Sequence, residues 1–108
     1  MILDRLVHRS PQTDGSYMAR YRTLLDEVDA ELMRLLAKRM EISREIGEVK
    51  KEKGLTVFQP YRYKETVERF AEHSAVHRLD AEAVKDIFEV IHSESIRQQL
   101  RIVNDIRD

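Results

Sequence analysis

The sequence predicts an all-α protein with three helices per chain, one long, one short and one of medium length, in an intertwined homodimer. Three Gly and two Pro among 108 residues leave too few turn-forming residues for many short strands. A chain of this length makes one domain at most. One long stretch repeats its apolar residues every seven positions, which is typical of helices that pair along a seam.

The overall composition argues against several functional classes. The 19 basic and 20 acidic residues leave a net charge of −1, so no global field attracts nucleic acid or an anionic membrane. The chain has no Cys, which excludes disulfides, thiolate catalysis and cysteine-bound zinc. No apolar run exceeds three residues, which argues against a signal-peptide core or a membrane-spanning helix. We therefore expect a cytoplasmic protein with neither nucleic acid nor membrane as a partner.

The first half of the chain contains the long helix. Residues 1–14 are predicted to form an N-terminal arm, and residues 15–108 a single helical domain. The long helix is expected from about Ser16, a suitable N-cap, to about Lys53. Gly54 follows at the position where helices commonly end on a left-handed residue.

The second half contains the two shorter helices, reached by a short connector. Pro60 fits the first position of a helix that runs to about His73, because the first helical N–H has no partner to lose. Asp80 is a suitable N-cap for a third helix that reaches about Val103.

The long helix carries two series of residues at seven-residue spacing, the pattern of a coiled-coil seam. The first series is Met18, Leu25, Leu32, Arg39 and Ile46, and the second is Tyr21, Val28, Leu35, Ile42 and Val49. About 38 helical residues span roughly 57 Å, whereas a compact domain of this size has a radius of gyration of about 13 Å. Burial of the whole stripe therefore requires a second chain, and we expect the two long helices to pair antiparallel.

One member of the seam, Arg39, is charged. A guanidinium in a buried stripe is costly unless it is paired, and no carboxylate shares the seam. Arg39, Ser43, Gly47 and Lys50 share one helical face. Because Ser and Gly are small, this face predicts a hollow with a cation at each end that binds a small anion. Two simpler interpretations stay open, namely an Arg39 head that reaches water and a Lys50 that complements the helix dipole.

Other polar residues extend this candidate anion site. The apolar stripe of the third helix leads to Ser95 and Gln99 in steps of four, although this end of the helix also fits exposure to solvent. Arg62 stands at the start of the second helix, beside its packed side. Arg22 lies 17 residues, about 25 Å, from Arg39 along the helix, so only an antiparallel partner chain brings it to the same pocket. A surface salt bridge is the other interpretation of Arg22.

The sequence offers little support for metal or covalent chemistry. His73 and His77 are spaced i, i+4, but they lie near a helix end and lack the adjacent Glu of HExxH zinc sites, so we expect no metal. We find no Gly-rich phosphate loop and no nucleophile–base pair. The residues favour binding and polarising a small anion over acyl or phosphoryl transfer.

Three motifs follow one another along the chain: D-x-x-L-x-x-L-L-x-x-R at 29–39, E-I-G-x-x-K at 45–50 and I-F-x-x-I-x-x-E-S-x-x-x-Q at 87–99. In this order they resemble the all-helical chorismate mutase family, and the resemblance covers about residues 17–103. It implies an intertwined dimer of three-helix chains. It also implies the rearrangement of chorismate to prephenate in Phe and Tyr biosynthesis, a pericyclic step without cofactor, metal or covalent intermediate.

The resemblance also implies roles for the charged residues. Arg39 and the partner chain's Arg22 would hold the two carboxylates of chorismate, each guanidinium matching a carboxylate by paired donors. Ser95 and Arg62 match positions that assist in binding these carboxylates. The implied substrate is therefore a small dianion held between two chains.

The reacting ether oxygen has its own implied partners, Lys50 and Gln99, which match the pair that donates hydrogen bonds as the C–O bond breaks. Two positions depart from the family pattern. Gln59 stands where an Asp is frequent, and Tyr63 stands where a Glu usually accepts from the substrate's ring hydroxyl. Gln59 or the Tyr63 hydroxyl is expected to replace these groups, and Tyr63 also fits the packed side of its helix.

Residues 1–14 lie outside the resemblance, and the family is often fused to other enzymes of aromatic amino-acid synthesis. We interpret this arm as a linker remnant of such a fusion, for instance with a DAHP synthase, which is then also a candidate partner. Two other functions stay open. One is a non-catalytic helical dimer that binds a small anion or regulates a fused or partner enzyme, and the other is an isochorismate pyruvate-lyase that uses the same pocket.

Overall fold

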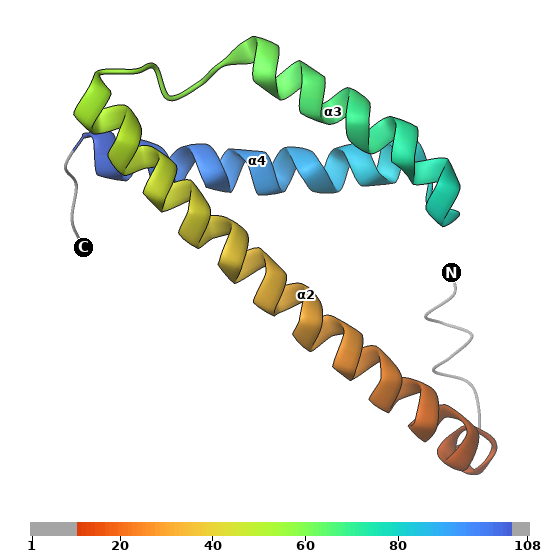
Figure 1. Cartoon of the computed structure of the whole chain (residues 1–108). Coiled ribbons are helices and arrows are strands. Elements are labelled where there is room, and N and C mark those ends of the chain that lie inside the picture. Colours follow the sequence, from red (N-terminus) through yellow and green to blue (C-terminus); the bar gives the residue numbers. More distant parts are fainter. Residues whose placement is uncertain (1–10, 105–108) are drawn as a thin grey trace. The chain divides into compact units, whose positions relative to one another are not determined.

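The computed structural model describes the backbone of residues 11–104 and the side chains of residues 17–104, so residues 1–10 of the predicted arm lie outside it. It contains the helices α2 (Pro11–Lys53), α3 (Pro60–Ser74) and α4 (Ala81–Val103), with a 3-10 turn, η1 (Ala75–His77), between the last two (Figure 1). No strand occurs among the described residues, and the predicted all-α class with three helices of unequal length is confirmed. In the same part of the chain, no helix combines the length and the apolar content that crossing a membrane requires.

The C-terminal end of α2 is closed by a glycine, as predicted. Gly54 adopts a φ of 66°, a left-handed conformation that is strained for residues with a Cβ. The N–H of Leu55 donates to the carbonyl of Lys50 at 2.9 Å, and the N–H of Gly54 donates to the carbonyl of Lys51 at 3.4 Å. This pair of bonds is a Schellman motif, and it satisfies two carbonyls that the helix end would leave without partners.

The helix starts depend on Pro and Asp. Pro60 stands at the beginning of α3, and Asp80 caps α4 by accepting a hydrogen bond from the N–H of Ala83 at 3.0 Å. α2 begins at Pro11, so the predicted start near Ser16 is wrong. Pro prevents a helix from continuing through it from the N-terminal side, but it is favoured as the first residue of a helix that follows.

The chain divides into two units, residues 1–37 and residues 38–108, which we describe separately. In the second unit η1 reverses the chain, and α4 runs alongside α3 (Figure 1). Aromatic rings join these two helices. The ring centroids of Phe70 and Phe88 are 4.7 Å apart and those of Tyr63 and Phe88 are 6.2 Å apart, and Phe88 is only 2% exposed.

α2 approaches α4 closely at Gly47. A Cβ built on Gly47 would lie 3.2 Å from the Cα of Gln99 and 3.4 Å from the Cβ of Ile102. The missing side chain therefore makes room for the backbone of α4. The prediction that this glycine contributes to a hollow for the anion is wrong, since the neighbouring helix fills the space.

The described part of the first unit is the N-terminal portion of α2. Five apolar residues of its predicted seam are each more than half exposed in the single chain, at 53–60%: Tyr21, Leu25, Val28, Leu32 and Leu35. Met18, the first residue of the seam, is partly buried. A soluble helix with such a stripe gains most of its stability from packing that stripe against another element.

Candidate active site

A cavity of about 510 Å³ lies in the second unit and is lined by residues of α2, α3, α4 and the connector between α2 and α3. It brings together seven of the eight residues that the sequence singles out: Arg39, Lys50, Gln59, Arg62, Tyr63, Ser95 and Gln99. The eighth, Arg22, belongs to the first unit.

Arg39 contributes a partly buried guanidinium to this cavity. Its central carbon lies 5.5 Å from the centroid of the Phe88 ring, a cation–π contact. Its Nη1 is buried and has no hydrogen-bond partner within the described part of the chain. Burial lowers the pKa of Arg39 from its ordinary value. An unpaired buried N–H is costly, and a ligand with an acceptor oxygen would remove that cost.

Lys50 is held at the opposite end of this helical face by two acceptors. Its Nζ donates to the carbonyl of Val57 at 2.6 Å and to Oε1 of Gln99 at 2.8 Å. An ammonium has three N–H bonds, so these two contacts leave one donor for another acceptor. Burial lowers the pKa of Lys50. Lys50 is therefore a positioned donor as well as a cation at a helix C-terminus.

A chain of polar contacts continues from Lys50 into the interior. Gln99 Nε2 donates to Ser95 Oγ at 3.4 Å, and the hydroxyls of Ser95 and Ser43 share a hydrogen bond. The three side chains are among the most buried of the described residues, with 5%, 6% and 3% exposure for Gln99, Ser95 and Ser43. The network thus fixes α4 against α2 by polar contacts, and these hold Gln99 in one orientation.

The charged residues that line the cavity share one sign. Four of them are cationic, Arg39, Lys50, Arg62 and Arg69, and none of the lining residues is acidic. Arg62 also pairs with the exposed Glu65, with Nη1 and Oε1 3.1 Å apart. A pocket lined by cations with apolar walls concentrates small anions.

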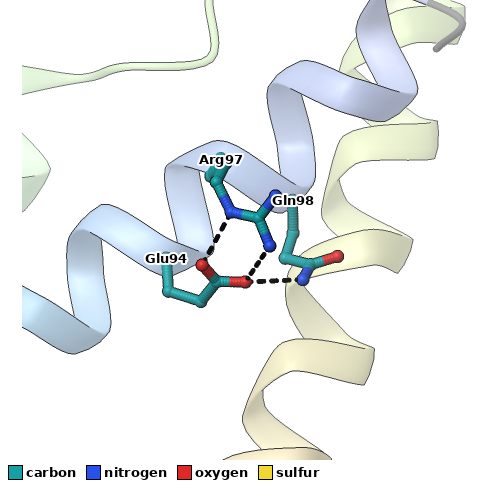
Figure 2. A network of polar contacts seen from close by, with 3 residues as sticks. All are labelled: Glu94, Arg97 and Gln98. Atoms are coloured by element: carbon teal, nitrogen blue, oxygen red, sulfur yellow. Dashed lines mark hydrogen bonds and ion pairs between the residues drawn. The ribbon is translucent and has the colours of Figure 1, made fainter. Parts of the chain in front are cut away.

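Glu94 is adjacent to Ser95 in sequence, but it is not among the lining residues. Figure 2 shows its carboxylate held on α4 by Arg97, whose Nε and Nη2 donate at 2.8 Å each, and by Nε2 of Gln98 at 2.7 Å. These hydrogen bonds, that of Arg97 first, lower the pKa of Glu94 to about 2. This carboxylate therefore stays charged and bound to its own helix.

His92 lines the cavity, and sequence reasoning missed it. Its ring centroid lies 4.4 Å from that of Tyr63, so both residues pack together at the cavity wall. The signal was present in the spacing, because His92 precedes Ser95 by three positions and Gln99 by seven and so shares their helical face. Gln59, the N-cap residue of α3, makes no capping bond with its side chain, which lines the cavity.

The other two described histidines lie elsewhere. His73 and His77 line a separate cavity of about 270 Å³ between the C-terminal end of α3 and the start of α4. Within residues 17–104, no group of three His, Cys, Asp or Glu side chains is arranged to hold a metal ion.

Comparison with known proteins decides the family. A family model described as chorismate mutase type II matches residues 21–100. The chain belongs to this family. Membership confirms the resemblance read from the three sequence motifs, and it makes the chain an isomerase with chorismate mutase function.

Individual relatives agree with the family model. The chorismate mutase of Methanocaldococcus jannaschii is 25% identical over 84 residues, covering 76% of this chain and 85% of its own. The T-protein of Enterobacter agglomerans is 37% identical over 87 residues, which are 78% of this chain and 21% of the T-protein. The 4-amino-4-deoxychorismate mutase of Streptomyces venezuelae is 28% identical over 85 residues, covering 79% of this chain and 82% of its own. The chain thus spans most of two relatives and about a fifth of the third.

Proposed function

We propose that the cavity of the second unit is the active site, in which chorismate is bound and rearranged to prephenate. The observation that carries this proposal is the buried Nη1 of Arg39, which lacks an acceptor among the described residues, in a cavity lined by cations. A carboxylate supplies the missing acceptor and matches a guanidinium by paired hydrogen bonds. Arg62 and Ser95 assist in holding the substrate's carboxylates.

The reaction breaks a C–O bond while a C–C bond forms, and no proton or covalent intermediate is required. Negative charge develops on the ether oxygen, and we assign its donors to the third N–H of Lys50 and to the amide of Gln99. The removal of one donor of this kind typically costs about 2.7–4 kcal/mol in the transition state. The walls of the cavity contribute the rest by holding the substrate in its reactive geometry.

We assign the substrate's ring hydroxyl to Gln59 and Tyr63. Both line the cavity, and Gln59 is the N-cap residue whose side chain is not used in capping. The Tyr63 ring packs near Phe88 and His92. Its hydroxyl is the polar group that this side chain can offer to the substrate. In this assignment neutral side chains take the place of the carboxylates that the resemblance implies at positions 59 and 63.

The active form in this proposal is an intertwined homodimer. The apolar seam of α2 is more than half exposed in the single chain between Tyr21 and Leu35, and only Val57 and Phe88 are buried hydrophobic residues among those described. A second copy covers the seam, and an antiparallel pairing brings the partner's α2 to the cavity with Arg22 as the second carboxylate ligand. Residues 1–14 remain an arm or linker remnant in this proposal, and a DAHP synthase is the proposed fused or associated enzyme.

The direct experiment follows the ultraviolet absorbance of chorismate in the presence of the purified chain and identifies the product. Arg39→Ala and Lys50→Ala are expected to lose turnover by a factor of about 100 or more while keeping the dimer, as measured by light scattering. Arg44→Ala and Lys53→Ala change the same residue types at exposed positions of α2 and are expected to keep wild-type turnover. Equal turnover in all four variants would show that the active site is elsewhere. Pyruvate as the product would show a lyase.

A mixed-dimer experiment tests the role of Arg22. Arg22→Ala chains and Arg39→Ala chains are inactive separately in this proposal. After they are mixed, unfolded and refolded together, about a quarter of the sites combine an intact Arg39 with a partner's intact Arg22. Recovery of about a quarter of the wild-type activity is expected. No recovery, with mixed dimers present, would contradict a contribution from the partner chain.

A further inference from the structure

His92 is the one histidine among the described residues that lines the large cavity. It is partly buried, and three aromatic rings surround it. Its ring centroid lies 4.4 Å from that of Tyr63, and it lies 5.9 Å from the centroids of both Phe58 and Phe88. These contacts place the imidazole in an apolar wall that faces a polar cavity.

The charged groups that line the cavity around this imidazole are all cationic, and they come from α2 and α3. From α2, Arg39 and Lys50 act on it electrostatically. From α3, Arg62 and Arg69 line the same cavity. The connector contributes Phe58 and Gln59, which carry no charge, and α4 contributes Ser95 and Gln99. None of the residues that line the cavity is a carboxylate.

Protonation of His92 is therefore disfavoured when no anion is bound. Burial lowers the pKa of His92 from its ordinary value, and the positive charges of Arg39 and Lys50 lower it further. At neutral pH the ring is then a neutral imidazole, which has one donor and one acceptor nitrogen. A bound dianion carries two negative charges, which offset those of Arg39 and Lys50 and so remove the repulsion that disfavours a proton on His92.

We propose that His92 is the proton-accepting group of the anion site: its imidazole is neutral in the ligand-free cavity and takes up one proton when a dianionic substrate or product binds. The proton comes from the solvent buffer and is bonded to the second ring nitrogen, and no other atom or electron is transferred. The bound dianion then faces a further positive charge in the wall of the cavity. This inference rests on the proposed function, because it requires that a dianion occupies this cavity.

The consequence is a dianion affinity that depends on pH. Between the midpoint of His92 in the ligand-free protein and its higher midpoint in the complex, each unit of decrease in pH strengthens binding by up to about tenfold. Above the higher midpoint the imidazole stays neutral in both states, and the affinity no longer depends on His92.

Calorimetric titration of the purified 108-residue protein with prephenate tests the inference. Titrations at pH 7 in two buffers of different ionisation enthalpy give the number of protons taken up on binding. We expect a measurable uptake, of up to about one proton per site, in the wild type. His92→Phe keeps an aromatic ring against Tyr63 and Phe88 but carries no titratable nitrogen, and its uptake is expected to be close to zero. His77→Gln, in the separate cavity, is the matched control and is expected to keep the wild-type uptake.

The outcomes separate this inference from the function on which it rests. Prephenate that binds the wild type without proton uptake, or with the same uptake in His92→Phe, overturns the role of His92 and leaves the active site intact. Prephenate that does not bind the wild type at all overturns both.

If His92→Phe does not fold, NMR titration of the His92 ring protons in the wild type replaces the variant. An upward shift of the midpoint on addition of prephenate supports the inference, and an unchanged midpoint contradicts it.

Discussion

Gly47→Ala tests the close approach of α4 to α2, and two effects of opposite sign compete in it. Replacing a glycine inside a helix by Ala gains about 0.5–1 kcal/mol from the backbone. The new Cβ, however, lies 3.2 Å from the Cα of Gln99 and 3.4 Å from its carbonyl oxygen. Both atoms belong to the α4 backbone, which moves only as a helix. Overpacking of this kind costs about 1–3 kcal/mol, so we expect a net destabilisation of about 0–2.5 kcal/mol.

Gly47→Ala is also expected to lower turnover. A Cβ at position 47 requires α4 to move by a few tenths of an ångström at Gln99, the residue that accepts from Lys50 and donates to Ser95. A misplacement of 1 Å can reduce turnover about 100-fold, and this smaller shift is expected to reduce kcat by roughly tenfold. Denaturant unfolding at fixed protomer concentration and steady-state kinetics with chorismate measure the two effects separately.

Gly54→Ala is the matched control. Gly54 has a φ of 66°, and a Cβ added to it would have no atom within 4 Å. Ala in this left-handed conformation costs about 1–2 kcal/mol and touches nothing in the cavity. We expect comparable or larger destabilisation with unchanged kcat. A Gly47→Ala variant that is more stable than the wild type and equally active would refute the argument, as would equal losses of kcat in both variants.

Three further predictions concern single charged groups. The value of kcat/KM, whose pH profile reports groups of the ligand-free enzyme, is expected to fall at alkaline pH with a midpoint below 10.5. The reason is that burial lowers the pKa of Lys50 and its neutral amine is a poorer donor; a midpoint at or above 10.5 would contradict this. The Glu94 carboxyl is expected to titrate by NMR at about pH 2 and to move toward its ordinary 4.5 in Arg97→Ala, and an unchanged midpoint would show that Arg97 is not the cause. Asp80→Ala is expected to lose about 1 kcal/mol of stability with unchanged kcat, since it removes the cap of α4. Asp80→Asn keeps a capping oxygen and is expected to retain most of the wild-type stability.

The helix ends show which local signals suffice for prediction. Helix boundaries are set by residues close to them in sequence. The boundaries predicted from Gly54, Pro60 and Asp80 agree with the structure. The start at Pro11 was missed because Pro both prevents and begins helices, and spacing alone does not decide between the two. The left-handed Arg78 after η1 was missed because that conformation usually selects Gly or Asn.

The candidate site also combines features that local sequence predicts with features that depend on tertiary packing. The helical spacing of Arg39, Ser43 and Lys50 predicted a shared face, and the structure places it against the face that carries Ser95 and Gln99. The role of Gly47 and the position of His92 depend on how α4 and α3 pack against other elements. Such contacts have no signature within a single helix, so the sequence alone could not supply them.

The polar interior of the second unit also limits how this enzyme can be engineered. Ser43, Ser95 and Gln99 are among its most buried described side chains, and they also line the proposed active site. In most domains, filling the centre with larger apolar residues is a practical route to a higher melting temperature. In this chain that strategy would remove polar groups of the proposed active site, and we expect a random library aimed at these positions to return mainly inactive variants. Selection for thermostability is therefore better directed at helix caps and at the solvent-facing positions of α4.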